Sequence, residues 1–182
     1  ENVRFIIPEG TKVRTVTINS GSFAETAPGT LSIAADTDVD GRSLTIAGED
    51  FSLAFDATRG NITAWKHAGR PIVNAGPRLQ LFRAPTDNDR GFGARYEQEW
   101  RKHWLHRLQH RLDAFAWRHV APALVEVRVH SYVAPPVVET GYTCVYVYRV
   151  YGSGDVMLEV HMQPRGPQPA SASSNRGHDR TL

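Results

Sequence analysis

A chain of 182 residues with 41% hydrophobic and 22% charged residues can bury one sizeable core, which excludes disorder along its whole length. Its 21 basic and 19 acidic residues leave a net charge of +2 with no long run of either sign, which argues against a nucleic-acid partner. It has no run of about 18 apolar residues and no signal-peptide pattern, so we expect a soluble, cytoplasmic protein with no membrane partner.

Residues 1–29 contain two short extended segments followed by a linker. Residues 3–7 and 13–18 have β-forming patterns and are separated by a proline–glycine turn. Residues 20–29 are mostly small and polar, which is typical of a linker or a long loop. We therefore expect residues 1–29 to be strands and a linker that belong to a preceding domain or lead out of one.

The next part of the chain alternates short apolar patterns with turns. Apolar and polar side chains alternate with a period of two, and turn residues recur every eight to twelve positions. This spacing is typical of an antiparallel sheet or sandwich. The expected strands are residues 31–35, 43–47, 51–55, 61–66 and 72–73.

The first of these turns has two interpretations. Asp36, Asp38, Asp40 and Gly41 match the opening of an EF-hand calcium loop. The twelfth position of such a loop is Ala47, where a bidentate glutamate is needed, and neither flank has a helical pattern. The sequence therefore favours a solvated acidic turn over a calcium site.

The stretch LQLFRAPTDNDRG, residues 79–91, holds the densest set of candidate site residues. Its apolar start, Leu79, Leu81 and Phe82, predicts a buried strand that ends in turn-forming and polar residues at a surface or cleft. The acid–amide cluster permits three roles: bonding within its own loop, hydrogen bonding to sugar hydroxyls, or binding a hard cation. The candidate residues are Arg83, Asp87, Asn88, Asp89 and Gly91.

After residue 91 the apolar period changes to three or four residues. Taken alone, residues 94–116 predict one amphipathic helix. On such a helix His103, His106 and His110 would share one face and could hold a metal, although a basic surface stripe explains them equally well. The tryptophans at 65, 100, 104 and 117 could stack on sugar rings, but core packing is the favoured interpretation.

The C-terminal part predicts three long strands and a tail. Residues 124–133 alternate cleanly, and residues 142–151 and 156–162 are rich in β-forming side chains. The single cysteine, Cys144, lies in the second of these strands; it excludes an intrachain disulfide, and we expect a buried structural thiol. Residues 164–182 lose all periodicity, which predicts a disordered tail.

Three segments carry a resemblance to a known family. RAPTDNDRG, FSLAFDATRGNITAWKHAGRPIV and VYVYRVYGSGDVMLEVHMQP resemble the C-terminal, small-chain domain of glycoside hydrolase family 2 β-galactosidases of the bacterial lactose-hydrolysing type. The resemblance implies a mainly β fold, an antiparallel β-sandwich of the galactose-mutarotase-like supersandwich class, with one short helix at residues 94–105 and a strand after it. The domain would span residues 30–163 and be incomplete, because the sequence departs from the family after that point.

The resemblance also implies a function. Such a domain packs on a catalytic barrel, or on a separate large subunit, and its loop would reach the rim of the site that binds a galactoside such as lactose. The catalytic glutamates of the family lie in the barrel, so we expect no catalytic residue, metal or cofactor in this chain; Mg and Na belong to the complete, oligomeric enzyme. Two alternatives stay open: a stand-alone carbohydrate-binding β-sandwich module and a mutarotase-like sugar epimerase.

Overall fold

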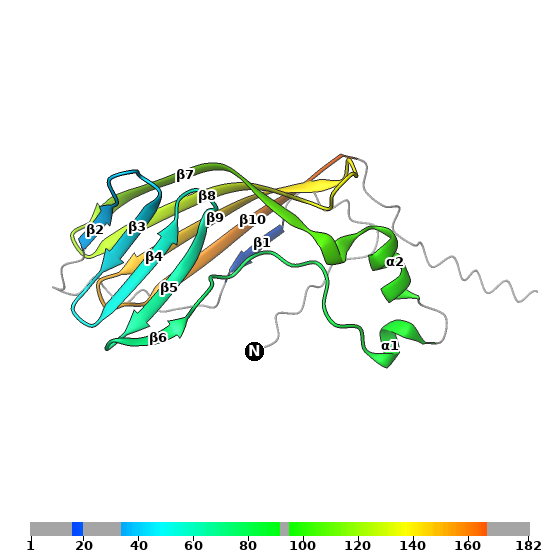
Figure 1. The fold of residues 1–182 in the computed structure, drawn as a ribbon, viewed down its shortest axis with the longest axis horizontal. Helices are drawn as coiled ribbons and strands as arrows, with labels where there is room; N and C mark the ends of the chain where they lie inside the picture. Colours follow the sequence, from blue (N-terminus) through cyan, green and yellow to red (C-terminus); the bar gives the residue numbers. More distant parts are fainter. Residues whose placement is uncertain (1–15, 20–33, 92–94, 167–182) are drawn as a thin grey trace, which may run out of the picture.

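The computed structural model describes residues 16–19, 34–91 and 95–166, and within them the fold is a β-sandwich. Two antiparallel five-stranded sheets face each other, and Figure 1 shows the shorter sheet lying over the longer one. The described helices are short, and the longest has seven residues. The expected mainly β, antiparallel sandwich with one short helix is confirmed.

The longer sheet has the strand order β1-β10-β9-β8-β7 and the shorter one β2-β3-β4-β5-β6. Strands β7 to β10 contain 10 to 13 residues, whereas β2 to β6 contain only four to seven, so the shorter sheet covers part of the longer one. The elements are β1 (Val16–Asn19), β2 (Ala34–Thr37), β3 (Ser43–Ala47), β4 (Phe51–Asp56), β5 (Asn61–His67), β6 (Arg70–Val73), α1 (Asp87–Arg90), α2 (Tyr96–Lys102), η1 (Leu105–Arg107), β7 (Gln109–Ala121), β8 (Leu124–Ala134), β9 (Gly141–Tyr151) and β10 (Val156–Arg165).

The core lies between the facing sheets, where the period-two pattern places every second side chain. Phe55 of β4 joins the sheets, because its ring packs edge-on against Tyr148 of β9 at 5.2 Å and in a tilted arrangement against Phe115 of β7 at 6.1 Å. The other fully buried large side chains come from both sheets and are aliphatic except for Cys144: Leu44, Ile46, Leu53, Val125, Val127, Val129, Val133, Val150 and Cys144. Burial of these groups is the main stabilising contribution to the fold.

One predicted strand is wrong. No strand forms between β6 and α1; the segment that contains Leu79, Leu81 and Phe82 instead crosses from the sandwich toward α1. Its polar groups pair singly rather than in a ladder: the Gly76 N–H donates to the Ile62 carbonyl at 2.8 Å, and the Leu79 N–H donates to the Tyr146 hydroxyl at 3.2 Å. The alternation reflects the packing of Leu79 against the core.

The remaining differences concern the ends of elements. The helix is shorter than expected, and β7 begins at Gln109, so the expected strand after the helix is confirmed and a single helix over residues 94–116 is excluded. Pro164 and Arg165, expected to begin the tail, are strand residues of β10. Part of the N-terminal region, β1, pairs with β10, while residues 1–15, 20–33 and 167–182 lie outside the described part, so the domain boundaries stay predictions.

Candidate functional site

The candidate residues lie on a small lobe that extends past one end of the sandwich. The crossing segment leads to α1, and α2 follows it; Figure 1 shows both helices clear of the two sheets. We call residues 82–91 and 95–107 the helical lobe. Its residues take no part in the core between the sheets.

Arg83 and Asp89 form a clip that closes the candidate loop. The guanidinium of Arg83 donates to both carboxylate oxygens of Asp89, at 2.6 and 2.8 Å. The N–H and hydroxyl of Thr86 donate to the same carboxylate at 2.7 and 2.8 Å. The Thr86 N–H and the Arg83 guanidinium hold the pKa of Asp89 below its usual range, so this carboxylate stays ionised. Asp89 is buried, and its bonding capacity is used within the loop.

A second set of ion pairs fixes α1 against α2. Glu97 of α2 accepts from Arg90 at 2.8 Å and from Arg101 at 2.9 Å. These two arginines, Arg90 before Arg101, hold the pKa of Glu97 below its usual range. The Gly91 N–H donates to the Asp87 carbonyl at 2.8 Å and ends the short helix. The loop therefore has a defined shape before any partner arrives.

Asp87 and Asn88 are the two candidate residues that face outward. Both are exposed, and among the described residues no hydrogen bond or ion pair engages either side chain. A carboxylate accepts, and an amide both donates and accepts, hydrogen bonds from hydroxyl groups. The five candidates thus divide by position: Arg83 and Asp89 hold the loop, Gly91 ends the helix through its backbone, and Asp87 with Asn88 can contact a ligand.

Aromatic side chains support the clip from below, which the sequence pattern did not reveal. The ring of Phe82 lies edge-on to Trp100 at 6.1 Å, and the Arg83 guanidinium lies 5.3 Å from the centre of the Trp100 ring. The guanidinium of Arg101 lies over the ring of Phe82, 5.5 Å from the ring centre. Cation–π contacts of this kind add to the ion pair because the guanidinium keeps its planar contact with the ring. The available signal for this aromatic support was the position of Trp100 on the same short helix as Glu97 and Arg101.

The metal hypotheses lose their geometric basis. His103 caps α2, His106 lies in η1 and His110 lies in β7, so the three do not share a helix face. Asp38 uses its carboxylate to accept from the N–H groups of Arg42 and Ser43 at 2.6 and 3.1 Å, in an ordinary turn. Within residues 16–19, 34–91 and 95–166, no group of three His, Cys, Asp or Glu side chains is arranged to hold a metal ion.

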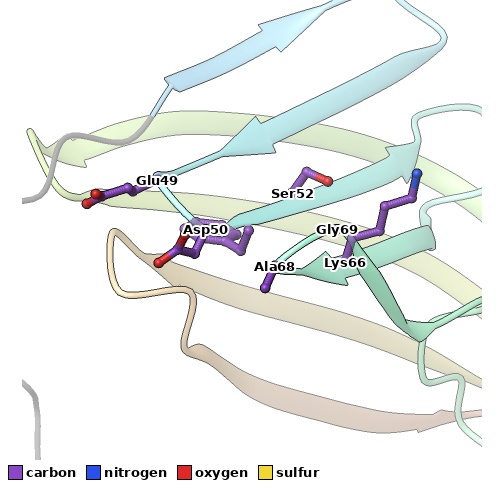
Figure 2. A pocket seen from close by; sticks show the side chains of 7 residues that line it. Glu49, Asp50, Ser52, Lys66, Ala68 and Gly69 are labelled. Carbon is purple, nitrogen blue, oxygen red and sulfur yellow. The ribbon is translucent and has the colours of Figure 1, made fainter.

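A surface hollow of about 390 Å³ lies on the shorter sheet near the turns that flank β4 and β5. Its charged groups do not converge: Figure 2 shows the carboxylates of Glu49 and Asp50 on one side and the ammonium of Lys66 on the other, pointing away. A ligand site needs a few polar groups aimed at one point. This hollow therefore gives no catalytic or binding arrangement.

Comparison with known proteins identifies a family. The family model described as the beta galactosidase small chain matches residues 47–177, a range that includes the loop at residues 82–91. The chain belongs to this family. A β-galactosidase of Streptococcus thermophilus is 36% identical to it over 52 residues, a segment that covers 29% of the chain and 5% of that relative.

The β-galactosidase small-chain domain thus spans a small part of the relative it matches. No described helix is long and apolar enough to cross a membrane.

Proposed function

We propose that this chain is a non-catalytic part of a β-galactosidase, which packs on the catalytic barrel and supplies its loop to the rim of the galactoside site. The observation that carries the proposal is the division of labour in the loop. Arg83 pairs with the buried Asp89 in a clip, while Asp87 and Asn88 project outward from it. Such a loop presents hydrogen-bonding groups at a fixed position without reorganisation when the sugar arrives.

The loop does not itself contain the acid pair of a glycosidase. Hydrolysis of a glycosidic bond needs two carboxyl groups that flank the bond, one of them able to give a proton. Asp89 is held ionised by its partners and is enclosed by them, which leaves Asp87 without a second acid in the loop. The proposal therefore places the hydrolytic groups in the catalytic partner and gives this chain a positioning role.

The wider setting follows from the same proposal. The substrate would be a terminal β-D-galactoside such as lactose, cleaved in the cytoplasm by an oligomeric enzyme. The complete enzyme would use Mg and Na in its catalytic part. The described residues of this chain offer no group of ligands for either ion, so we assign the ions no step here.

Complementation tests the proposal. The full chain is mixed with the β-galactosidase large chain from the same source, and hydrolysis of lactose is measured. Asp87→Ala is compared with Asp40→Ala, which removes an equally exposed carboxylate from the distant β2–β3 turn. A hydrogen bond to a charged group contributes about 1.5–3 kcal/mol. We therefore expect Asp87→Ala to lower kcat/KM about 10- to 100-fold and Asp40→Ala to leave it unchanged.

Two results would contradict the proposal. The wild-type chain could fail to raise the activity of the large chain, or the Asp87→Ala chain could restore activity as well as wild type does. Asn88→Ala provides a second probe at the neighbouring position, where loss of a neutral hydrogen bond predicts a smaller decrease, about two- to tenfold.

A further inference from the structure

Exposed apolar side chains gather at the lobe end of the molecule. Seven large apolar residues are exposed in the described part of the chain, and four of them lie on α2, beside η1 or in the β8–β9 turn. Their exposed fractions are 55% for Tyr96, 37% for Trp104, 93% for Val137 and 37% for Val138. The other three are scattered over the β2–β3 turn, β6 and β7: Val39, Ile72 and Val120. A cluster of this kind is typical of an interaction surface, whereas scattered residues are not.

The backbone at this end adds a second, independent observation. Trp104 and Val137 have φ values of 57° and 58°, in the left-handed region that disfavours residues with a side chain. For a β-branched valine this conformation is especially unfavourable. The isolated chain gains nothing by holding Val137 in solvent in that conformation. A partner that buries its side chain would explain why this valine is 93% exposed in the isolated chain.

An apolar cavity opens beside these residues. It has a volume of about 250 Å³ and lies between the helical lobe and the β8–β9 turn. Val138 lines it and is also exposed, so the cavity opens on the same surface. Its volume is sufficient for an apolar side chain of another protein. The apolar lining residues are Trp100, Leu105, Pro135, Val138 and Tyr142.

This surface is continuous with the candidate loop. Trp100, which lines the cavity, also packs against Phe82 and lies under the Arg83 guanidinium of the clip. A body that covers the cavity therefore contacts the same lobe that holds Asp87 outward. Since the loop is proposed to reach the catalytic site, the molecule that carries that site is the one positioned to cover the cavity.

The helical lobe carries a small excess of positive charge. Residues 83–107 contain six Lys and Arg against four Asp and Glu, and the Arg107 guanidinium lies 5.2 Å from the ring centre of the exposed Trp104. A partner surface with an apolar centre and an acidic rim would complement this arrangement.

We propose that the catalytic partner of the β-galactosidase docks on the surface formed by Tyr96, Trp100, Trp104, Val137 and Val138, with one of its apolar side chains in the cavity. This inference rests on the proposed function, because it takes the partner from it. The surface acts as the anchor, and the loop carrying Asp87 acts on the substrate. The two roles separate in experiment.

Matched valine substitutions test the docking surface. Val137→Asp and Val39→Asp both place a carboxylate at an almost fully exposed hairpin position. Val137 lies on the proposed docking surface, and Val39 lies outside it. The Kd of the full chain for the large chain is measured by titration calorimetry at pH 7. We expect Val137→Asp to raise the Kd at least tenfold, because docking would bury the carboxylate, and Val39→Asp to leave it unchanged.

Val137→Gly guards against a folding artefact. Glycine accepts the positive φ without cost, so this variant folds at least as well as wild type while losing the apolar contact. We expect a Kd increased about 10- to 100-fold, the effect of losing one buried valine side chain. Thermal unfolding of each isolated variant confirms that it is folded.

Several outcomes would overturn the inference. Equal Kd values for Val137→Asp and Val39→Asp would do so. So would self-association of the wild-type chain that Val137→Asp abolishes, because the surface would then join two copies. Galactose binding by the isolated chain that Trp100→Ala abolishes would assign the cavity to a sugar.

Asp87→Ala with normal Kd and normal activity would refute the loop proposal alone and leave the docking surface standing.

Discussion

Glu126 lies at the centre of three arginines on the outer face of the longer sheet, and it gives a sharp stability prediction. One carboxylate oxygen accepts from Arg118 of β7 at 3.0 Å and from Arg128 of β8 at 2.9 Å, and the other lies 3.7 Å from Arg149 of β9. The side chain of Glu126 is only 5% exposed. The cluster therefore joins three neighbouring strands through one buried charge.

The expected cost of Glu126→Gln lies between two limits. Breaking a fully buried ion pair costs about 3–5 kcal/mol, whereas an exposed pair contributes about 0–1 kcal/mol. Here the carboxylate is buried, but the side chains of Arg118 and Arg128 are 67% and 48% exposed, so water screens the pairs. Glutamine keeps the volume and one accepting oxygen, but it loses the charge and replaces the second oxygen with an NH2 group that cannot accept from an arginine. We expect a decrease of about 2 kcal/mol in the free energy of unfolding, or about 4–8 °C in Tm.

The pH dependence identifies the charge as the cause. Arg128, followed by Arg118, lowers the pKa of Glu126 from its ordinary value of 4.5. A carboxyl whose pKa is lower in the folded state stabilises the fold above its unfolded pKa and loses that contribution as the pH falls through the folded value. The difference between wild type and Glu126→Gln is therefore largest near pH 7 and decreases as the pH falls below about 4.5.

Urea unfolding of both chains at pH 7 and pH 3 measures this difference. Glu159→Gln is the control, because that side chain is 28% exposed and lies 3.4 Å from Arg149. It is expected to cost less than about 1 kcal/mol. Equal midpoints for wild type and Glu126→Gln at pH 7, or a difference that stays constant down to pH 3, would refute the reasoning.

Two further predictions concern the core. Gly60 has a φ of 66°, and an added Cβ would meet the side chains of Val129 and, at 2.7 Å, Leu112; Gly60→Ala should therefore destabilise the fold by about 2–4 kcal/mol, measured by urea unfolding, and a loss below about 0.5 kcal/mol would contradict the packing described. Cys144 is fully buried, and burial raises the pKa of its thiol to about 11, so a thiol reagent at pH 8 should label it only after unfolding. Rapid labelling of the native chain would show that this strand opens.

The sequence predicted the strands whose side chains alternate between core and solvent. The pattern in β8 is clear because Val125, Val127 and Val129 face the shorter sheet while the intervening residues face outward. The same holds for β4, in which Phe51, Leu53 and Phe55 are buried. In both strands the period follows directly from backbone geometry, so a single sequence is enough.

Features that depend on register between strands could not be predicted. Glu126 lies on the face of β8 opposite the core valines, but the pairing of β8 with β7 and β9 brings arginines from both neighbours over it and buries it. The strand predicted for the crossing segment was wrong for a local reason: the alternation over Leu79 and Leu81 was too short to distinguish a strand from an extended connection. The clip was predicted in part. Bonding within the loop was one of the expected roles of the acid–amide cluster, but the burial of Asp89 was not expected.

The unequal strand lengths of the two sheets have a consequence for how this domain can diverge. The shorter sheet leaves one end of the longer sheet to the crossing segment and the helical lobe, which join the sandwich through few contacts such as that between Leu79 and Tyr146. Substitutions in the lobe therefore leave the facing valines and aromatics undisturbed. A lineage can alter what the lobe meets while keeping the sandwich intact, so recognition and folding are free to evolve at different rates.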